Sequence, residues 1–327
     1  MDSFGSFGLY HNYVDVWKIM TTMHVNKECV LTIFTPAYNR AHTIGRTYRS
    51  LCRQTSKDFE WLIIDDGSTD NTRQLVEGWI LEGVISIRYI YQKNQGMHGA
   101  HNTAYKNINT ELNTCIDSDD WMPDDAVEKI VSFWKKFGSK RVAGIVGLDA
   151  TIEGNIIGSI FPSELKETTL SGFYKQGGRG DKKLVYRTDI IQQYPEYPRF
   201  KDERYFSLGY KYLLIDQDYR LLTINEVLVV VDYQMDGSSY GMYRQYWNNP
   251  LGFMFLRKEH MKYYIGWSER FRSCIHYVSH CLRARRLKEL FLNPCPFLTL
   301  LSILPGVVLY LVTKYKVTHS QVMSFSK

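Results

Sequence analysis

Short apolar runs alternate with amphipathic stretches along residues 29–147. The apolar runs predict strands over 30–35, 61–65, 86–91, 112–117 and 141–147. The amphipathic stretches between them predict helices over 43–53, 71–81, 99–107 and 124–137. Strands and helices that alternate at this spacing form βαβ units. The expected fold class is therefore α/β, with a mostly parallel central sheet that helices cover on both faces.

Three polar segments follow predicted strands directly, at residues 36–40, 65–68 and 117–120. The ligands of open α/β sheets bind beyond the carboxyl ends of the strands. We therefore expect a binding site at this edge of the sheet.

The second of these segments begins with two adjacent carboxylates, Asp65 and Asp66. It can be a simple turn, in which Gly67 takes a positive φ and Thr69 or Asp70 caps the next helix. Alternatively, one of the carboxylates accepts hydrogen bonds from a nucleobase or a ribose. The residues alone leave both interpretations open.

The third segment holds three carboxylates within four residues, Asp117, Asp119 and Asp120. Such crowding is costly unless a cation neutralises it. Carboxylate oxygens suit Mg²⁺ or Mn²⁺, which usually combine one or two protein carboxylates with substrate phosphates. The alternative is a helix N-terminus, which Pro123 and Asp124 would help to form.

Composition narrows the class of protein. Of 327 residues, 44% are hydrophobic and 23% are charged, which excludes a disordered, collagen-like or disulfide-stapled chain. The net charge of +6 arises wholly between Arg257 and Glu289, where nine Lys or Arg face three Asp or Glu. Six cysteines without a CxxC pair indicate reduced thiols that act as small apolar fillers. P-loop, GxGxxG and HExxH motifs are absent from the sequence.

The two ends of the chain differ in character. Residues 1–28 lack the features of a secretory signal and are expected to form an extension. Residues 290–313 carry no charge, are interrupted by Pro305, and have basic residues on both sides. Such a tail favours contact with an anionic cytoplasmic leaflet. A re-entrant or in-plane helical pair is the first expectation, and a single span or a helical hairpin buried within the protein are the alternatives.

The polar segments, taken in order, resemble those of family 2 glycosyltransferases. The resemblance rests on residues 35–40, 65–70, 94–96 with Asn102, and 117–120. It implies a GT-A catalytic domain over 29–240, a nucleotide-sugar donor and inversion at the anomeric carbon. A basic amphipathic helical region over 241–289 and a membrane-associating tail over 290–327 would follow this domain.

The resemblance also implies roles by position. The residues that would contact the nucleotide sugar are Pro36, Ala37, Tyr38, Arg40, Asp65, Asp66, Asn94, Gly96, Asn102, Asp117 and Ser118. Asp66 or Asp65 would hold the uracil or ribose. Asp119, with Asp117, would hold Mn²⁺ or Mg²⁺ on the diphosphate. Some relatives carry Lys at the position of Met97, and others carry Arg at that of His101. Protonated His98 and His101 could replace such a cation here, or either could be a core or helix-face histidine.

The same comparison points to a general base and an acceptor region. Glu203 matches an acid of the family and is the first choice as base, with Asp202 second, and Leu208 stands where a second acid often appears. Glu203 could instead be a surface acid paired with a neighbouring cation. Residues 177–188 are expected to form a glycine-rich loop followed by an edge strand. In relatives this region borders the acceptor, so Lys183, Tyr186 and Arg187 are the expected acceptor contacts.

The sequence thus predicts an inverting, metal-dependent hexosyltransferase on the cytoplasmic face of the cell membrane. Its acceptor would be a lipid-linked saccharide in surface polysaccharide synthesis. A sugar nucleotidyltransferase is the alternative enzyme, although residues 36–38 lack the glycine-rich loop of that class. A non-catalytic polysaccharide-binding protein is the alternative from another class. Nucleic acid is not an expected partner, because the carboxylates would repel its phosphates.

Overall fold

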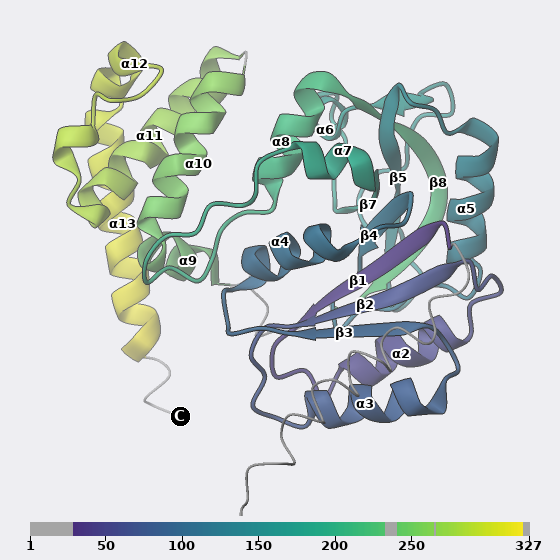
Figure 1. Ribbon diagram of the computed structural model, residues 1–327. Helices are drawn as coiled ribbons and strands as arrows, with labels where there is room; N and C mark the ends of the chain where they lie inside the picture. The colour runs from purple at the N-terminus through teal and green to yellow at the C-terminus, as the bar shows by residue number, and fades with distance from the viewer. Residues whose placement is uncertain (1–28, 233–240, 265, 323–327) are drawn as a thin grey trace, which may run out of the picture.

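The computed structural model describes residues 29–232, 241–264 and 266–322. Residues 29–232 form an α/β unit around one sheet, and the helices from residue 241 onward form a second, helical unit beside it (Figure 1). The extension expected over 1–28 lies outside the described residues. All six cysteine thiols are free, as expected.

Eight strands form one mixed sheet in the order β3-β2-β1-β4-β7-β5-β8-β6. The strands are β1 (Leu31–Ala37), β2 (Phe59–Asp65), β3 (Ile87–Tyr91), β4 (Leu112–Cys115), β5 (Val142–Thr151), β6 (Glu167–Thr168), β7 (Lys182–Arg187) and β8 (Arg220–Val231). β1 pairs in parallel with β2 and β4, β2 with β3, and β5 with β8. The expectation of a mostly parallel central sheet is confirmed.

β7 is not the edge strand that we expected. It lies between β4 and β5 and is antiparallel to both. The Lys182 amine donates to the carbonyls of Ile157, Arg179 and Asp181, at 3.0 to 3.1 Å. Because these carbonyls satisfy the ammonium group, a lysine can occupy a central strand of the sheet.

Alternate residues of the central strands face opposite helical layers. Ile33 and Trp61 pack on the side of α2, α3 and α5, whereas Phe34 and Leu62 pack on the side of α4, α7 and α8. The helices of this unit are α2 (Ile44–Cys52), α3 (Thr72–Glu82), α4 (Met97–Asn107), α5 (Ala126–Phe137), α6 (Leu170–Lys175), α7 (Thr188–Gln193) and α8 (Gly209–Asp218). Burial on both faces explains why these strands are continuous apolar runs.

The helical unit has its own small core. Its elements are α9 (Met242–Asn248), α10 (Pro250–Tyr263), α11 (Trp267–Ala284), the 3₁₀ turn η2 (Leu287–Glu289), α12 (Pro296–Leu301) and α13 (Ile303–Val322). Met254 and Met261 of α10 pack against Cys274, Tyr277 and Cys281 of α11. The uncharged stretch 290–313 is thus divided between two helices. Among the described residues, no helix is both long and apolar enough to cross a membrane.

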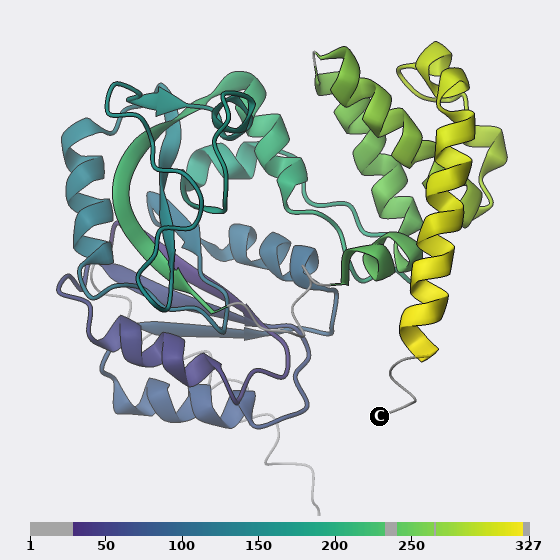
Figure 2. The ribbon, with the colours of Figure 1, turned by 180° about the vertical axis from the view of Figure 1, so that it is seen from behind.

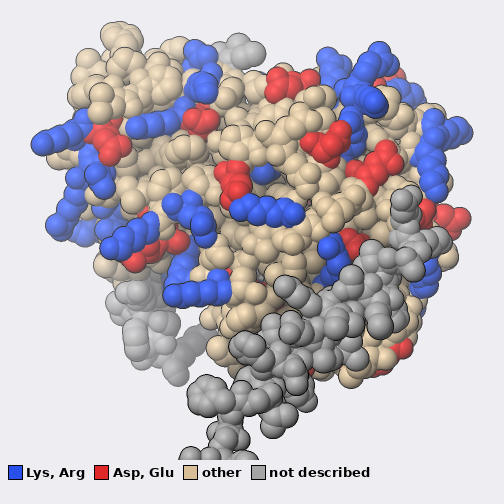
Figure 3. All heavy atoms as spheres, viewed as in Figure 1, with Lys and Arg blue, Asp and Glu red and all other residues tan. Residues whose placement is uncertain are grey.

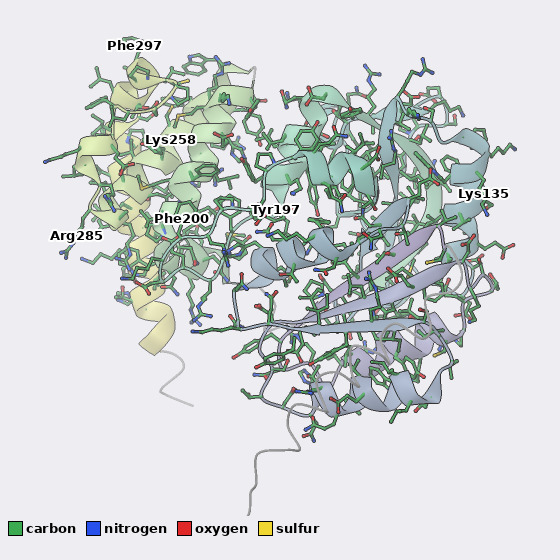
Figure 4. The ribbon with its side chains drawn as sticks, viewed as in Figure 1. Lys135, Tyr197, Phe200, Lys258, Arg285 and Phe297 are labelled. Atoms are coloured by element: carbon green, nitrogen blue, oxygen red, sulfur yellow. The ribbon has the colours of Figure 1, made fainter. Side chains whose placement is uncertain are left out.

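The segment between α7 and α8, residues 194–208, joins the two units, and we refer to it as the connecting segment. The two carboxylate oxygens of Glu203 accept hydrogen bonds from the amides of Leu251 and Gly252, at 2.7 and 2.8 Å. These amides belong to the first turn of α10, where backbone donors lack helical partners and a negative charge is favourable. Figure 4 shows Phe200 of the same segment between the units, and its ring lies 6.1 Å from that of Phe255.

Asn249 makes the reciprocal contact. Its side-chain oxygen accepts hydrogen bonds from the amides of Arg204 and Tyr205, at 2.9 and 3.0 Å, and its side chain is buried. One amide side chain therefore satisfies two backbone donors of the connecting segment.

Asn249→Ala is expected to lower the free energy of unfolding by about 2 kcal/mol or more, because it leaves two partly buried amides without an acceptor. The measurement is urea denaturation followed by tryptophan fluorescence. Asn248→Ala, at the exposed neighbouring position, is the matched control and should change the midpoint little. Equal midpoints for the two variants would contradict the role of Asn249.

Candidate active site

A cavity of about 520 Å³ opens at the carboxyl ends of β1 and β4, the edge that the sequence pattern indicates. Ten of the residues expected at the site line this cavity. They are Pro36, Ala37, Tyr38, Arg40, Asp66, Asp117, Ser118, Asp119, Lys183 and Tyr186. The tertiary structure therefore brings together the polar loops that follow β1, β2 and β4, and it adds residues of β7.

The acidic turn at 117–120 is not the cap of the helix that follows it. α5 begins at Ala126, and its N-cap residue Asp125 makes no side-chain capping bond. Within the turn, the backbone amide of Asp120 donates to the carbonyl of Asp117 at 3.1 Å, and one carboxylate oxygen of Asp120 accepts from the amide of Asp232 at 3.1 Å. The turn is held by backbone contacts, and its carboxylates face the cavity.

The carboxylates of this turn carry an electrostatic cost. Burial, together with the charge of Asp117, raises the pKa of Asp120 to about 8. Burial and the same neighbour also raise the pKa of Asp119. Lys183 on β7 and Arg40 offset part of the repulsion at Asp120 and Asp119, respectively. The turn is therefore a place where a bound cation would relieve like-charge repulsion.

The donor set fits Mg²⁺ or Mn²⁺ when part of the coordination comes from a substrate. Asp117 and Asp119 would supply hard oxygen ligands from a tight turn that lines the cavity. No group of three or more His, Cys, Asp or Glu side chains is arranged to hold an ion by itself in the part of the chain that the structure describes. Such a site needs phosphate oxygens to complete it, which is the usual pattern for Mg²⁺.

The loop after β1 is fixed to the loop after β2. Asn39 has a φ of 54°, and its side-chain oxygen accepts a hydrogen bond from the amide of Thr69 at 2.8 Å. The amide of Asn39 donates to the hydroxyl of Ser68 at 2.9 Å, and the amide of Arg40 donates to the hydroxyl of Thr72 at 3.0 Å. These contacts fix the backbone of the loop, so Tyr38, half exposed at 49%, and Arg40 project from a rigid base.

The two adjacent aspartates after β2 differ in role. Asp65 is fully buried and accepts hydrogen bonds from the amide of Ser68 at 2.7 Å and the hydroxyl of Tyr89 at 2.6 Å. It therefore closes the turn and does not line the cavity. Asp66 does line it, although its oxygens also accept bonds from the amides of Gln95 and Gly96, both at 2.8 Å.

Comparisons with known proteins agree with this geometry. Residues 32–194 match the family described as Glycosyl transferase family 2. The glucosyltransferase WfgD of Escherichia coli, named as acting on UDP-Glc and α-D-GlcNAc-diphosphoundecaprenol, is 28% identical over 212 residues, which are 65% of this chain and 79% of that protein. The first curated relatives match over only 125 and 128 residues, which are 38% and 18% of their own lengths.

Solved structures share the fold. TarS of S. aureus, in a complex with UDP-GlcNAc, superposes with a TM-score of 0.56 at 17% identity and covers 81% of this chain and 76% of its own. A mannosyltransferase of Pyrobaculum calidifontis, in a complex with GDP-Man and Mn²⁺, gives a TM-score of 0.52 at 15% identity and covers 92% and 94%. At these identities the likeness establishes the GT-A fold alone.

This chain belongs to glycosyltransferase family 2. The family resemblance carried by its polar loops is thereby confirmed. The fine assignments made by position, by contrast, depend on where each side chain lies in this glycosyltransferase.

Besides Asp65, three residues expected to contact the donor do not line the cavity. Asn94 accepts hydrogen bonds from the guanidinium of Arg204, at 2.6 Å to its side-chain oxygen. Gly96 has a φ of 81° and packs so closely on the Arg204 carbonyl that a Cβ there would lie 2.2 Å from it. The Asn102 amide exchanges two hydrogen bonds with the backbone of Tyr197, at 2.8 and 2.9 Å. All three hold the connecting segment against α4, so the structure gives them a positioning role.

Of the two interpretations of His98 and His101, the structure supports core histidines and not replacements for a missing cation. Burial lowers the pKa of His98 to about 4 and that of His101 to about 3. The His101 ring packs edge-on against those of Phe34 and Tyr197, at centroid distances of 5.0 and 6.2 Å. Both imidazoles are therefore neutral at physiological pH and belong to the core.

Glu203 and Asp202 do not line the cavity either. Both oxygens of Glu203 are engaged by the first turn of α10, as described above. Asp202 is exposed, with a φ of 65°. The position of Glu203 therefore contradicts the prediction that it is the general base. It is also not the surface acid of the alternative interpretation. Its carboxylate caps α10 at the junction of the two units.

Of the three residues expected to contact the acceptor, two lie in the cavity and one does not. Lys183 and Tyr186 line the cavity, and the buried Tyr186 hydroxyl has no hydrogen-bond partner among the described residues. Arg187 lies at the opposite end of β7, where it donates to the carbonyl of Lys140 at 2.9 Å and pairs with Asp189. Since β7 runs antiparallel to β4, its last residue points away from the catalytic edge, and Arg187 is removed from the acceptor site.

The sequence interpretation missed Asp149. This residue of β5 is 5% exposed and lines the cavity, and one of its carboxylate oxygens has no hydrogen-bond partner among the described residues. Burial raises its pKa to about 6. A single carboxylate in the apolar run of β5 is a signal that could have identified it, because buried acids without partners are rare outside functional sites.

Asp149→Asn is expected to stabilise the protein in a pH-dependent way. The folded pKa of about 6 exceeds the ordinary value near 4. The unfolded chain therefore loses this proton first, and wild-type stability falls between about pH 4 and pH 6. The Tm of the variant relative to wild type should rise across that window, by on the order of 5 °C, and stay constant above it.

Differential scanning calorimetry from pH 4 to pH 8 measures this effect. Asp124→Asn, which removes an exposed aspartate outside the cavity, is the control. A Tm difference for Asp149→Asn that does not vary with pH would show that the carboxylate is not destabilised by burial.

Proposed function

We propose that this glycosyltransferase is an inverting hexosyltransferase. It would transfer a sugar from a UDP-sugar donor to a hydroxyl group of a lipid-linked saccharide during surface polysaccharide synthesis. The observation that carries the proposal is the cavity of about 520 Å³, in which the loop after β1, Asp66 and the acidic turn face one another. A loop for the nucleoside and carboxylates for a metal-bound diphosphate are the two elements that a nucleotide sugar requires.

Asp119 and Asp117 would hold Mn²⁺ or Mg²⁺. The raised pKa of Asp119 and the Mn²⁺ complex of the mannosyltransferase with the same fold support this assignment. When bound, such an ion offsets the charge that develops on the leaving diphosphate. Arg40, on the rigid loop after β1, faces the same cavity and supplies a further positive charge beside the acidic turn.

The acceptor class follows from a relative and not from the cavity. The name of WfgD describes transfer of glucose to a GlcNAc-diphosphoundecaprenol, and the match covers 79% of that protein. A lipid-linked saccharide is therefore the acceptor class we propose for this chain. The unpartnered hydroxyl of Tyr186 and the amine of Lys183 are cavity groups that can orient a sugar.

The acceptor hydroxyl must lose its proton as its oxygen attacks the anomeric carbon and the bond to the diphosphate breaks. Glu203 is engaged in capping α10, and Leu208, at the start of α8, offers no carboxylate. Outside the acidic turn, Asp149 is a buried cavity carboxylate, and one of its oxygens has no hydrogen-bond partner among the described residues. We therefore propose that Asp149 accepts this proton.

The donor proposal predicts that UDP-hexoses or UDP-hexosamines raise the Tm of the protein with Mn²⁺ or Mg²⁺ present, and that EDTA removes the effect. Asp119→Asn should abolish the ligand-dependent increase. The control, Asp124→Asn, removes an exposed aspartate that pairs with Arg53 outside the cavity. If no nucleotide sugar shifts the Tm or releases its nucleotide with either metal, the proposed function is wrong.

The base proposal predicts different results for two carboxylate variants. Asp149→Asn should lower kcat for release of UDP by about 10²-fold or more while the donor Kd stays within about threefold. Glu203→Gln should keep kcat near that of wild type and lower the urea midpoint, because one capping acceptor is weakened. Loss of kcat in Glu203→Gln with donor binding intact would restore Glu203 as the base.

A further inference from the structure

The end of the chain exposes an unusual number of large apolar side chains. Eleven of the 22 large hydrophobic side chains that are exposed among the described residues lie within 287–315. We refer to these eleven as the apolar face. They are Leu287, Phe291, Leu292, Phe297, Leu300, Leu301, Leu304, Val308, Leu311, Val312 and Tyr315. A concentration of exposed apolar side chains of this kind marks an interaction site.

α13 has two distinct sides. Its members of the apolar face recur at helical spacing from Leu304, which is 75% exposed, to Tyr315, which is 62% exposed. The other side packs inward through Gly306, Thr313 and Val317, which are buried. The outward residues are therefore a continuous stripe, and not scattered surface positions.

Contacts on the inner side fix the orientation of this stripe. A Cβ on Gly306 would lie 2.5 Å from Val278 of α11, so the two helices touch there. The ring of Tyr310 stacks on Trp247 of α9 at a centroid distance of 5.7 Å. In Figure 2, α13 lies in front of α10 and α11, and no other described element covers it. α13 is thus held rigidly with its apolar side outward.

The charges around the apolar face are almost all positive. Residues 285–319 contain five Lys or Arg and a single acid, Glu289. This acid already lies 3.6 Å from Lys258 and 3.8 Å from Arg286. Figure 4 shows Phe297 and Arg285 both projecting outward from this unit, and in Figure 3 the tan surface over α12 borders blue side chains.

We propose that the apolar face docks in the plane of an anionic lipid bilayer. Apolar side chains on one side of short helices, with basic residues at their margin, are the pattern of an interfacial helix that lies in the headgroup region. A second copy of the chain is the less suitable occupant, because a two-fold contact would bring the basic margins of both copies together. The docking surface stands independently of the donor and acceptor proposed above.

The edge of the sheet that carries the cavity lies toward the helical unit. In Figure 1, β1 and β2 point toward the side of the molecule on which the helical unit lies. The hydrogen bonds of Glu203 and Asn249 join the helical unit to the segment beside α4. The catalytic edge is therefore the edge of the sheet that lies toward the unit carrying the apolar face.

Vesicle sedimentation of the full chain tests the proposal. Wild type should bind phosphatidylcholine vesicles that contain about 30% phosphatidylglycerol, and bind pure phosphatidylcholine at least about tenfold more weakly. The triple variant Phe297→Ser, Leu304→Ser, Leu311→Ser should lose at least about tenfold in vesicle partitioning. The double variant Lys314→Gln, Lys316→Gln should bind anionic vesicles more weakly and with less dependence on salt.

The matched control replaces three exposed apolar residues outside the apolar face, Leu81→Ser, Phe137→Ser and Ile160→Ser. It should bind vesicles as wild type does. Nucleotide-sugar binding by thermal shift should be unchanged in all variants, so a failure of the donor proposal and a failure of docking are distinguishable.

Two results would overturn the proposal. One is a wild-type dimer, seen by light scattering, that does not bind vesicles and becomes monomeric in the triple variant. The other is full retention in membranes after an alkaline carbonate wash, which would indicate a span in place of in-plane docking. Release by carbonate, with vesicle binding by wild type and the control alone, supports it.

Discussion

The sheet of this glycosyltransferase is buried on both faces, and this constraint decides where polar chemistry can occur. Ile33 and Phe34 of β1 face opposite helical layers. A charged group on either face of this strand would be buried, which is costly without a partner. Polar side chains therefore gather where the strands end. The loops after β1, β2 and β4 meet at one edge, and the antiparallel strand β7 adds Lys183 to the same cavity.

The cavity keeps carboxylates in an environment that disfavours their charge. Burial raises the pKa of Asp119, Asp120 and Asp149, and the positive charges of Arg40 and Lys183 offset only part of this cost. Such a cost lowers the stability of the unliganded protein at neutral pH. It is consistent with a site whose charges are balanced by a cation and a diphosphate when substrate binds.

The contacts of the connecting segment explain why Glu203, an acid expected to be the base, has another role. Glu203 lies in the part of the chain where a base is expected, yet its carboxylate caps α10 and thereby holds the helical unit in place. The same junction sets how the apolar face is oriented relative to the cavity. A residue expected to do chemistry thus contributes to the arrangement of the two units.

The sequence alone determined the strand and helix order to Gly147, the edge at which the cavity opens and the residues of the acidic turn. Local pattern suffices for these features, because apolar periodicity and strand-end loops are properties of contiguous residues. The apolar, uncharged tail and its basic margin were also visible in the sequence. The family resemblance came from short loops in a fixed order.

Only the tertiary structure decided which polar residues share the cavity. Asn102 and Arg187 have polar groups that could contact a substrate. In the structure, however, Asn102 bonds to the backbone of Tyr197, and Arg187 lies at the end of β7 away from the cavity. Asp149 joined the site because β5 runs beside β7, and β7 became a central strand through long-range pairing. These outcomes depend on contacts between residues distant in the chain, which no local pattern encodes.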